Sequence, residues 1–91
     1  MTLLEEVRAR LRLKSTTFDD LEIEPLIFAC ISDLARVGII ATEETDDPLI
    51  RQAVVLYCKA NFGYSDAAEA FQQAYEGLRD AIALSGIGGD G

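Results

Sequence analysis

Apolar residues recur at spacings of three and four in four stretches of this 91-residue chain, a pattern typical of helices that bury one face. The first stretch follows Thr2, where the sequence T-L-L-E predicts a capping box with Glu5 as its second member. Its apolar stripe comprises Leu3, Leu4, Val7 and Leu11. Residues 13–17 show no sustained period and end in S-T-T, so we expect a loop before the second helix.

The second helix contains a proline near its start. Asp19 and Asp20 would lie at its N-terminal end, where the helix dipole favours acids. Inside a regular helix, Pro25 would delete a hydrogen bond and clash with the preceding turn. We therefore expect a loose first turn, a continuous helix over about 25–37 and a stop at Gly38, because glycine suits the residue after a helix.

The third helix is predicted by its cap. Asp47 can accept hydrogen bonds from the free amides of a helix start, and Pro48 suits the first helical position because its missing N–H costs nothing there. We expect this helix to run to about Asn61 and Gly63 to end it. Its expected apolar side comprises Leu49, Ile50, Ala53, Val54, Tyr57 and Ala60, with Arg51 and Lys59 outside it.

The fourth helix is predicted to begin near Ser65 or Asp66, with Glu69 placed to complete a second capping box. Its expected apolar stripe comprises Ala67, Phe71, Ala74, Tyr75, Leu78 and Ile82. The short turn before it predicts antiparallel packing of the third and fourth helices, with the second helix covering their shared apolar face. Gly77 lies inside the fourth helix, where it marks either close helix packing or an idle exposed face.

Together these elements predict an all-α fold, a small bundle of about four helices with short connections, in which the polar connection 39–47 can be partly extended. We expect a single helical domain over residues 1–84 and a flexible glycine-rich tail over residues 85–91, since SGIGGDG cannot hold a helix without outside contacts. A chain of this length buries roughly 60–65% of the surface that its unfolded form exposes. Its single core would therefore gain from assembly.

The side chains exclude most catalytic and metal chemistry. The chain has no histidine, the most frequent general base and a common zinc ligand. Cys30 and Cys58 lie in apolar helical runs without a C-x-x-C pair, so we expect buried free thiols, with a disulfide or a reactive thiol as the alternative. The serines lack a triad setting and no phosphate-binding loop is present. We expect a non-enzymatic protein without cofactor or metal.

The sequence predicts neither a membrane-spanning helix nor a secretory signal. It contains no run of about 18 apolar residues, the length that a spanning helix needs. Its N-terminus has acids before its cations and lacks an apolar stretch followed by small residues, so it does not resemble a secretory signal. We expect the protein to be cytoplasmic when made.

Charge is unevenly distributed along the chain, whose net value is −8. Half of the eight cations lie within seven residues, namely Arg8, Arg10, Arg12 and Lys14. Half of the sixteen acids form two blocks, Asp19, Asp20, Glu22 and Glu24, and then Glu43, Glu44, Asp46 and Asp47. A solvated face explains each block singly, but segregated charges also suit head-to-tail association. The candidate contacts between copies are Arg8, Arg10 and Arg12 on one side and Glu43, Glu44 and Asp46 on the other.

Aromatic residues gather around the turn between the third and fourth helices, and core packing explains most of them. Phe62 and Tyr64 flank Gly63 in this turn, so we expect these two to remain partly exposed. They are further interface candidates, because aromatic side chains are enriched in protein interfaces.

Four segments of the chain resemble the small head-tail connector proteins, an adaptor family of tailed phages and prophages. They are the opening L-x-x-V-R-A-R-L-R-L, the acidic entry D-D-x-x-x-x-x-L-I, the block DPLIRQAVVLYCKANFGY and the closing F-Q-Q-A-Y-E-G-L-R. The third of these is the most specific, since amphipathic helices alone would not identify the family. Pro25 and the glycine-rich tail depart from the family pattern.

The resemblance implies a mostly helical ring subunit that lies beneath the portal of a filled capsid and offers the surface on which a tail attaches. Its implied partners are copies of itself, the portal protein and tail-completion proteins, with DNA passing through the ring without sequence-specific binding. Such a protein is made in the host cytoplasm and ends in the virion, at the head-tail junction. Two alternatives stay open: a DNA-binding or DNA-packaging accessory that uses the basic N-terminal segment, and a monomeric module that binds a protein through Phe62 and Tyr64.

Overall fold

A computed structural model describes residues 1–62 and 66–85, and over these residues the fold is all-helical without strands. The elements in chain order are α1 (Leu3–Arg10), the π-helical turn η1 (Asp19–Ile23), α2 (Glu24–Arg36), α3 (Pro48–Asn61) and α4 (Ala68–Ser85). The predicted all-α fold with four main helices is therefore confirmed. Residues 86–91, where most of the predicted tail falls, lie outside the described residues.

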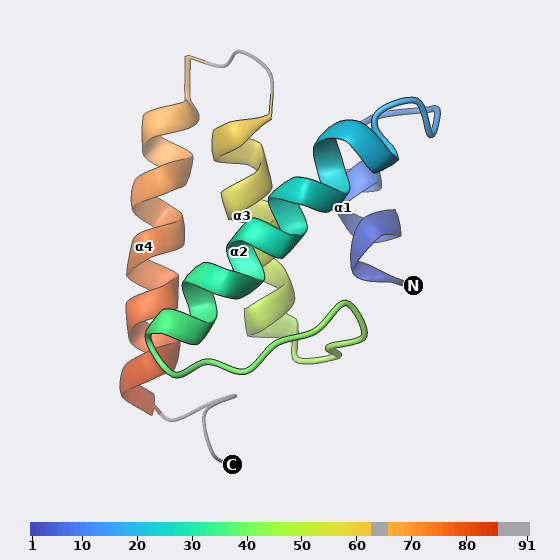
Figure 1. Ribbon diagram of the computed structural model, residues 1–91. Coiled ribbons are helices and arrows are strands. Elements are labelled where there is room, and N and C mark those ends of the chain that lie inside the picture. The colour runs from blue at the N-terminus through green and yellow to red at the C-terminus, as the bar shows by residue number, and fades with distance from the viewer. Residues whose placement is uncertain (63–65, 86–91) are drawn as a thin grey trace.

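Helix α3 lies at the centre of the molecule and packs against each of the other three helices (Figure 1). Its most extensive contact is with α4, which runs antiparallel to it, as predicted from the short turn. Helix α2 crosses in front of α3 and α4, whereas α1 lies on the other side of α3 from α4. The molecule is elongated, with principal extents of 36, 27 and 18 Å.

The core is one cluster of apolar side chains that every helix supplies. Its largest fully buried members are Tyr75, Leu3, Ile23, Ile27, Leu34, Ile39, Ile50, Ile82, Val7, Val54, Val55 and Cys30. Cys30 and Cys58 are buried free thiols, as predicted. Burial disfavours the charged thiolate and raises the pKa of each thiol to about 12. Both cysteines therefore serve as small apolar residues of the core.

Two predicted helix caps are present. In α1 the Thr2 hydroxyl accepts the Glu5 amide at 3.1 Å, and the Glu5 carboxylate accepts the Thr2 amide at 2.9 Å. These bonds form the predicted capping box, and the bond from the Thr2 amide is the main cause of a lowered pKa at Glu5. At α3 the Asp47 carboxylate accepts the Leu49 amide at 2.8 Å and the Ile50 amide at 3.3 Å. Both helices consequently begin where the sequence places them.

The loose first turn expected before α2 takes the form of η1. The Phe18 carbonyl accepts the amides of both Glu22 and Ile23, at 3.0 and 2.9 Å, so the chain is wound more widely here than in an α-helix. Regular α-helix then begins at Glu24, which leaves Pro25 in the first turn, where its missing N–H has no helical partner to lose.

Helices α1 and α2 end in the same hydrogen-bonded motif, with one residue in the left-handed region. After α2, Gly38 has φ +88° and its amide donates to the Ala35 carbonyl, while the Ile39 amide donates to the Leu34 carbonyl. Gly38 is thus the predicted stop. After α1 the left-handed residue is Arg12, with φ +62°. An arginine here carries a steric cost that glycine avoids, roughly 1 kcal/mol.

The start of α4 differs from the prediction. Asp66 and Ala67 form a turn and the helix begins at Ala68, so neither Ser65 nor Asp66 is its first residue. Gly63 and Ser65 lie outside the described residues, and α3 ends with Phe62 in an extended conformation as its cap. A Cβ added at Gly77 would meet nothing within 4 Å, so this glycine lies on an open face of the chain.

The apolar sides of α3 and α4 are narrower than predicted. Leu49 is 44% exposed, and Ala67 and Ala74 are exposed as well. Arg51 was placed outside the apolar side of α3 but is largely covered, with 13% of its side chain exposed. The residues that cover it form the site described next.

Candidate functional site

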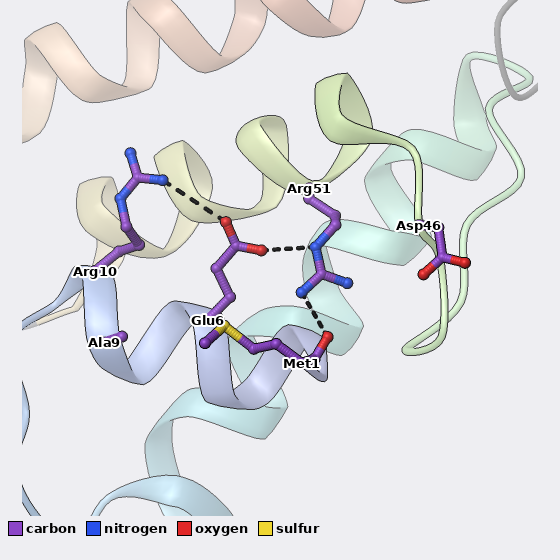
Figure 2. A pocket seen from close by; sticks show the side chains of 6 residues that line it. All are labelled: Met1, Glu6, Ala9, Arg10, Asp46 and Arg51. Atoms are coloured by element: carbon purple, nitrogen blue, oxygen red, sulfur yellow. Dashed lines mark hydrogen bonds and ion pairs between the residues drawn. The ribbon is translucent and has the colours of Figure 1, made fainter.

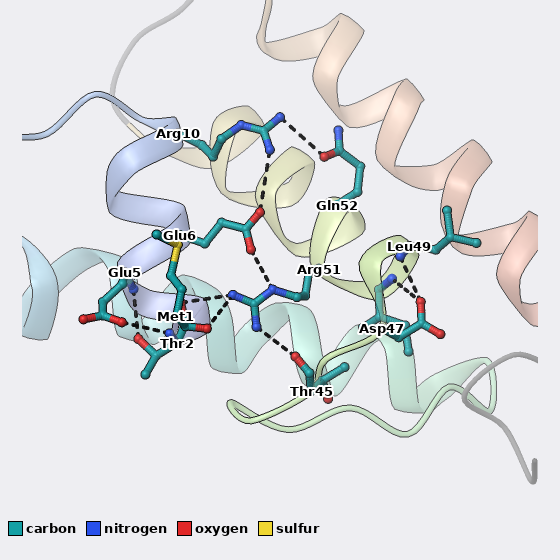
Figure 3. Close-up of polar contacts among 11 residues, drawn as sticks. Met1, Thr2, Glu5, Glu6, Arg10, Thr45, Asp47, Leu49, Arg51 and Gln52 are labelled. Atoms are coloured by element: carbon teal, nitrogen blue, oxygen red, sulfur yellow. Dashed lines mark hydrogen bonds and ion pairs between the residues drawn. The ribbon is translucent and has the colours of Figure 1, made fainter.

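Arg51 ties together three segments that are far apart in the sequence (Figure 3). From the first turn of α3 its Nε donates to a Glu6 carboxylate oxygen of α1 at 2.6 Å. One terminal nitrogen donates to the Thr45 carbonyl at 2.9 Å, and the other donates to the carbonyls of Met1 at 2.8 Å and Thr2 at 3.2 Å. Arg51 therefore fixes the start of α1 and the end of the 39–47 connection against α3.

Arg10 adds a second, weaker contact to this cluster. One of its terminal nitrogens lies 3.7 Å from the other Glu6 carboxylate oxygen, one helical turn away, and the other donates to the Gln52 side chain at 3.4 Å. The Arg10 side chain remains 43% exposed. Glu6 thus lies between two guanidinium groups, and its negative charge offsets both of them in part.

A shallow hollow of about 480 Å³ opens to solvent at this junction (Figure 2). Its lining residues are Met1, Glu6, Ala9, Arg10, Asp46 and Arg51. The side chains of Arg10 and Arg51 contribute two positive charges to this lining, and those of Glu6 and Asp46 contribute two negative ones. The guanidinium of Arg51 already donates hydrogen bonds to Glu6 and to backbone carbonyls. The hollow is therefore a polar surface recess in which both signs of charge are present, with Glu6 and Arg51 already paired to each other.

A second polar cluster joins α2 to α4. The Asp33 carboxylate accepts the Tyr75 hydroxyl at 2.5 Å, an Arg79 nitrogen at 3.0 Å and an Arg36 nitrogen at 2.9 Å. Desolvation opposes ionisation of Asp33, but the hydrogen bonds from Tyr75 and Arg79 outweigh it and lower its pKa. Desolvation and the bond to Asp33 raise the pKa of Tyr75. This cluster holds α4 against α2 and sets the position of the outer helix.

The predicted basic residues have three different environments. Arg8 is half-buried, Arg10 is engaged with Glu6 and Gln52, and Arg12 is exposed in its left-handed position. They therefore do not form one uniform cationic surface.

The predicted acidic residues lie on the connection between α2 and α3. Glu43 is half-buried, Glu44 and Asp46 are exposed, and the Glu44 amide donates to the Thr42 hydroxyl at 3.1 Å within a turn. Asp46 lines the hollow together with Arg10. The fold thus brings one acidic and one basic candidate to the same recess of a single chain.

Of the two aromatic candidates, only Phe62 falls within the described residues. It is half-buried, as expected, and its ring meets that of Phe18 edge to face with centroids 5.6 Å apart. Tyr64 lies outside the described residues. Phe62 consequently supports the exposed ring of Phe18 at the start of η1.

Two further observations bear on the kind of site this chain can hold. Over residues 1–62 and 66–85, His, Cys, Asp and Glu side chains form no group of three or more that could hold a metal ion. Within the same part of the chain, each helix is too short or too polar to cross a membrane.

Comparison with known proteins and protein families shows what this chain is similar to. The model of the family described as "Phage connector protein" matches residues 3–86, nearly the whole chain. The chain belongs to the phage connector protein family. No curated protein and no solved structure matched it in the same comparison. The match spans the four helices of the connector protein and confirms the resemblance seen in its sequence segments.

Proposed function

We propose that this connector protein is a non-enzymatic structural subunit that forms a ring beneath the portal and joins the DNA-filled head to the tail. The family match over residues 3–86 carries this proposal. The described fold agrees with it, since its polar clusters are occupied with holding helices together. The net charge of −8 also suits a passage for DNA, because a negative lining lets the duplex move without binding.

Its proposed partners are copies of itself, the portal protein and tail-completion proteins, with no cofactor and no membrane. Assembly would take place in the host cytoplasm and the finished ring would lie in the virion. The decisive test is the solution mass by light scattering across protein concentration and salt, alone and with the portal protein of the same phage. A closed assembly of many copies is expected. A chain that stays monomeric and leaves the portal unoccupied would overturn the proposal.

Charge contributes to the contact between copies in this proposal. The basic candidates Arg8, Arg10 and Arg12 face acids of the neighbouring copy, among them Glu43, Glu44 and Asp46. Arg12 contributes most in this proposal, because it is exposed, whereas Arg8 is half-buried and Arg10 contacts Glu6 and Gln52. Arg12→Glu is therefore expected to weaken assembly more at low than at moderate salt. Full assembly of Arg12→Glu at both salt concentrations would remove charge pairing from the proposal.

A DNA-binding accessory is the second candidate, and the concentration of half of the eight cations in residues 8–14 is the observation that favours it. A mobility shift with duplex DNA that weakens steeply with salt would support it. The shift should disappear when Arg8, Arg12 and Lys14 are replaced together by glutamine. Arg10 is less suited to phosphate, because it already contacts Glu6 and Gln52.

A further inference from the structure

Large apolar side chains exposed on the described part of the connector protein fall, Met1 aside, into two patches. The first patch, here called the apolar flank, comprises Phe18, Leu21 and Phe28 at 41, 84 and 49% exposure. The second, here called the apolar end, comprises Val37, Ile40, Leu49 and Leu84 at 39, 63, 44 and 90% exposure. Isolated exposed apolar residues need no explanation, but clustered ones on a small protein mark contact surfaces.

The apolar flank belongs to the outer face of η1 and α2. Ile23, Ile27 and Cys30 fill the inner face of this segment and are fully buried, whereas Leu21 and Phe28 are left outside. Phe18 precedes η1 and is held in place by its edge-to-face contact with Phe62. The flank is thus a fixed surface, positioned by the core beneath it.

The apolar end is assembled from the ends of three helices. The Asp33–Arg79 ion pair at 3.0 Å joins α2 to α4; Val37 follows Asp33 by four residues and Leu84 follows Arg79 by five, so both come near the ends of their helices. The left-handed Gly38 then turns the chain so that Ile39 is fully buried and Ile40 is left outside. Leu49 lies in the first turn of α3, beside the α4 end in this antiparallel pair (Figures 1 and 3).

The two patches lie toward opposite ends of α2. Leu21 precedes α2 and Val37 follows it, so the length of this 13-residue helix, about 20 Å, separates these two residues, while Phe28 of the flank lies in the first half of the helix. In Figure 1 the start of α2 lies at the upper right, and the ends of α2 and α4 lie at the lower left. Two different patches on one chain are what a heterologous, head-to-tail contact between identical copies requires.

Charges next to the patches are complementary. Exposed Arg12 and Lys14 lie in the loop that leads into the flank, whereas Glu44 lies in the connection that bears the apolar end. Exposed Glu22 lies beside Leu21. Arg36, which pairs with Asp33 and whose side chain is 78% exposed, lies beside Val37, so this second pair of charges has the reverse sense. A second copy therefore matches each patch in both apolar surface and charge, and pairing of opposite charges also fixes its orientation.

We propose that the apolar end of one connector copy docks onto the apolar flank of the next. The inference rests on the proposed ring function and names the surfaces that build the ring. Each copy contributes one end and one flank, so contacts propagate in one direction and close when the rotation per copy completes a circle. Leu21 and Leu84, the most exposed members of the two patches, are the centre of the contact.

Two single variants test the pairing. Leu21→Asp breaks the flank and leaves the end intact, and Leu84→Asp does the reverse. Each variant alone should need a protein concentration about a hundredfold higher than the wild type to assemble, because a carboxylate would be buried in an apolar contact. An equimolar mixture should form dimers and nothing larger, since the intact end of one variant can dock onto the intact flank of the other. Native mass spectrometry separates these species.

Ala74→Asp on α4 and Ser32→Asp on α2 are the matched controls, because they add the same charge to exposed positions outside both patches. Both should assemble like the wild type, and circular dichroism should show all four variants folded. Rings formed by Leu21→Asp or Leu84→Asp, or a mixture that yields no dimer, would overturn the pairing while leaving the ring function standing. A wild-type chain that stays monomeric at about 1 mM, with and without portal protein, would overturn the ring function itself.

Discussion

Replacement of Arg51 by methionine should destabilise the connector protein far more than the position of Arg51 on the polar side of α3 suggests. The substitution keeps much of the aliphatic bulk and removes every polar contact. Glu6, whose side chain is 23% exposed, would lose its 2.6 Å partner, and the carbonyls of Met1, Thr2 and Thr45 would lose theirs. The α1 start and the 39–47 connection would then be held by apolar contacts alone.

The size of the effect follows from the number and burial of these bonds. Hydrogen bonds to charged groups contribute about 1.5–3 kcal/mol each when buried, and partial exposure at this site reduces that figure. We expect a loss of about 2–4 kcal/mol from a total stability of roughly 5–14 kcal/mol for a domain of this length. The melting temperature should fall by about 10–20 °C. Arg51→Lys should cost less than Arg51→Met, because lysine keeps the positive charge. It should still be less stable than the wild type, because its single nitrogen cannot reach all four acceptors at once.

Urea unfolding followed by circular dichroism measures this loss, and Arg36→Met is the matched control. Arg36 also pairs with a carboxylate, but its side chain is 78% exposed, so its removal should cost less than about 1 kcal/mol. A double-mutant cycle of Arg51→Met with Glu6→Gln should give a coupling of at least about 1 kcal/mol. An Arg51→Met variant within about 0.5 kcal/mol of the wild type would refute the view that Arg51 holds these segments together.

Three further substitutions probe other parts of the fold. The pKa of Asp33 is lowered from its ordinary value of 3.8, so its ionised form stabilises the fold above pH 3.8 and this contribution is lost as the pH falls below that value. Asp33→Asn should therefore be less stable than the wild type at pH 7. Urea unfolding at each pH should show that the variant loses less stability than the wild type between about pH 4 and 2. Arg12→Gly should raise the free energy of unfolding by about 0.5–1 kcal/mol by relieving the left-handed backbone, and no gain would mean that the strain is absorbed elsewhere. Gly77→Ala should stabilise α4 by up to about 1 kcal/mol, since the new methyl group meets nothing within 4 Å. A lower melting temperature for this variant would contradict the open space around Gly77.

Features that depend on neighbouring residues were well predicted from the sequence. The capping box at Thr2, the Asp47 cap and the stop at Gly38 each involve atoms within about five residues of one another, so a local pattern contains all that they need. The start of α4 was placed two or three residues early, since Asp66 and Ala67 form a turn instead. Helix boundaries are set by competing local turns and are less well defined than the helices themselves.

The candidate site was predicted less well, and for a physical reason. The spacing of Glu6 and Arg10 suggests an ion pair along α1, but nothing near Arg51 in the sequence indicates its partners, of which Glu6 lies 45 residues away. Helical periodicity placed Arg51 on the outside of α3, which is correct for α3 alone. The packing of α1 and of the 39–47 connection over that side covers it in the folded chain.

The sequence by itself determined the helical class, the caps of α1 and α3, the buried thiols and the family, because amphipathic period, hydrogen-bonding side chains and characteristic segments are all local properties of a chain. Only the tertiary structure decided which polar residues are covered and which apolar residues are left uncovered. Arg51 is largely covered and Leu84 is exposed, although the first is a cation and the second continues an amphipathic helix. Each helix specifies its own two sides, but the neighbours that lie over those sides come from residues far along the chain.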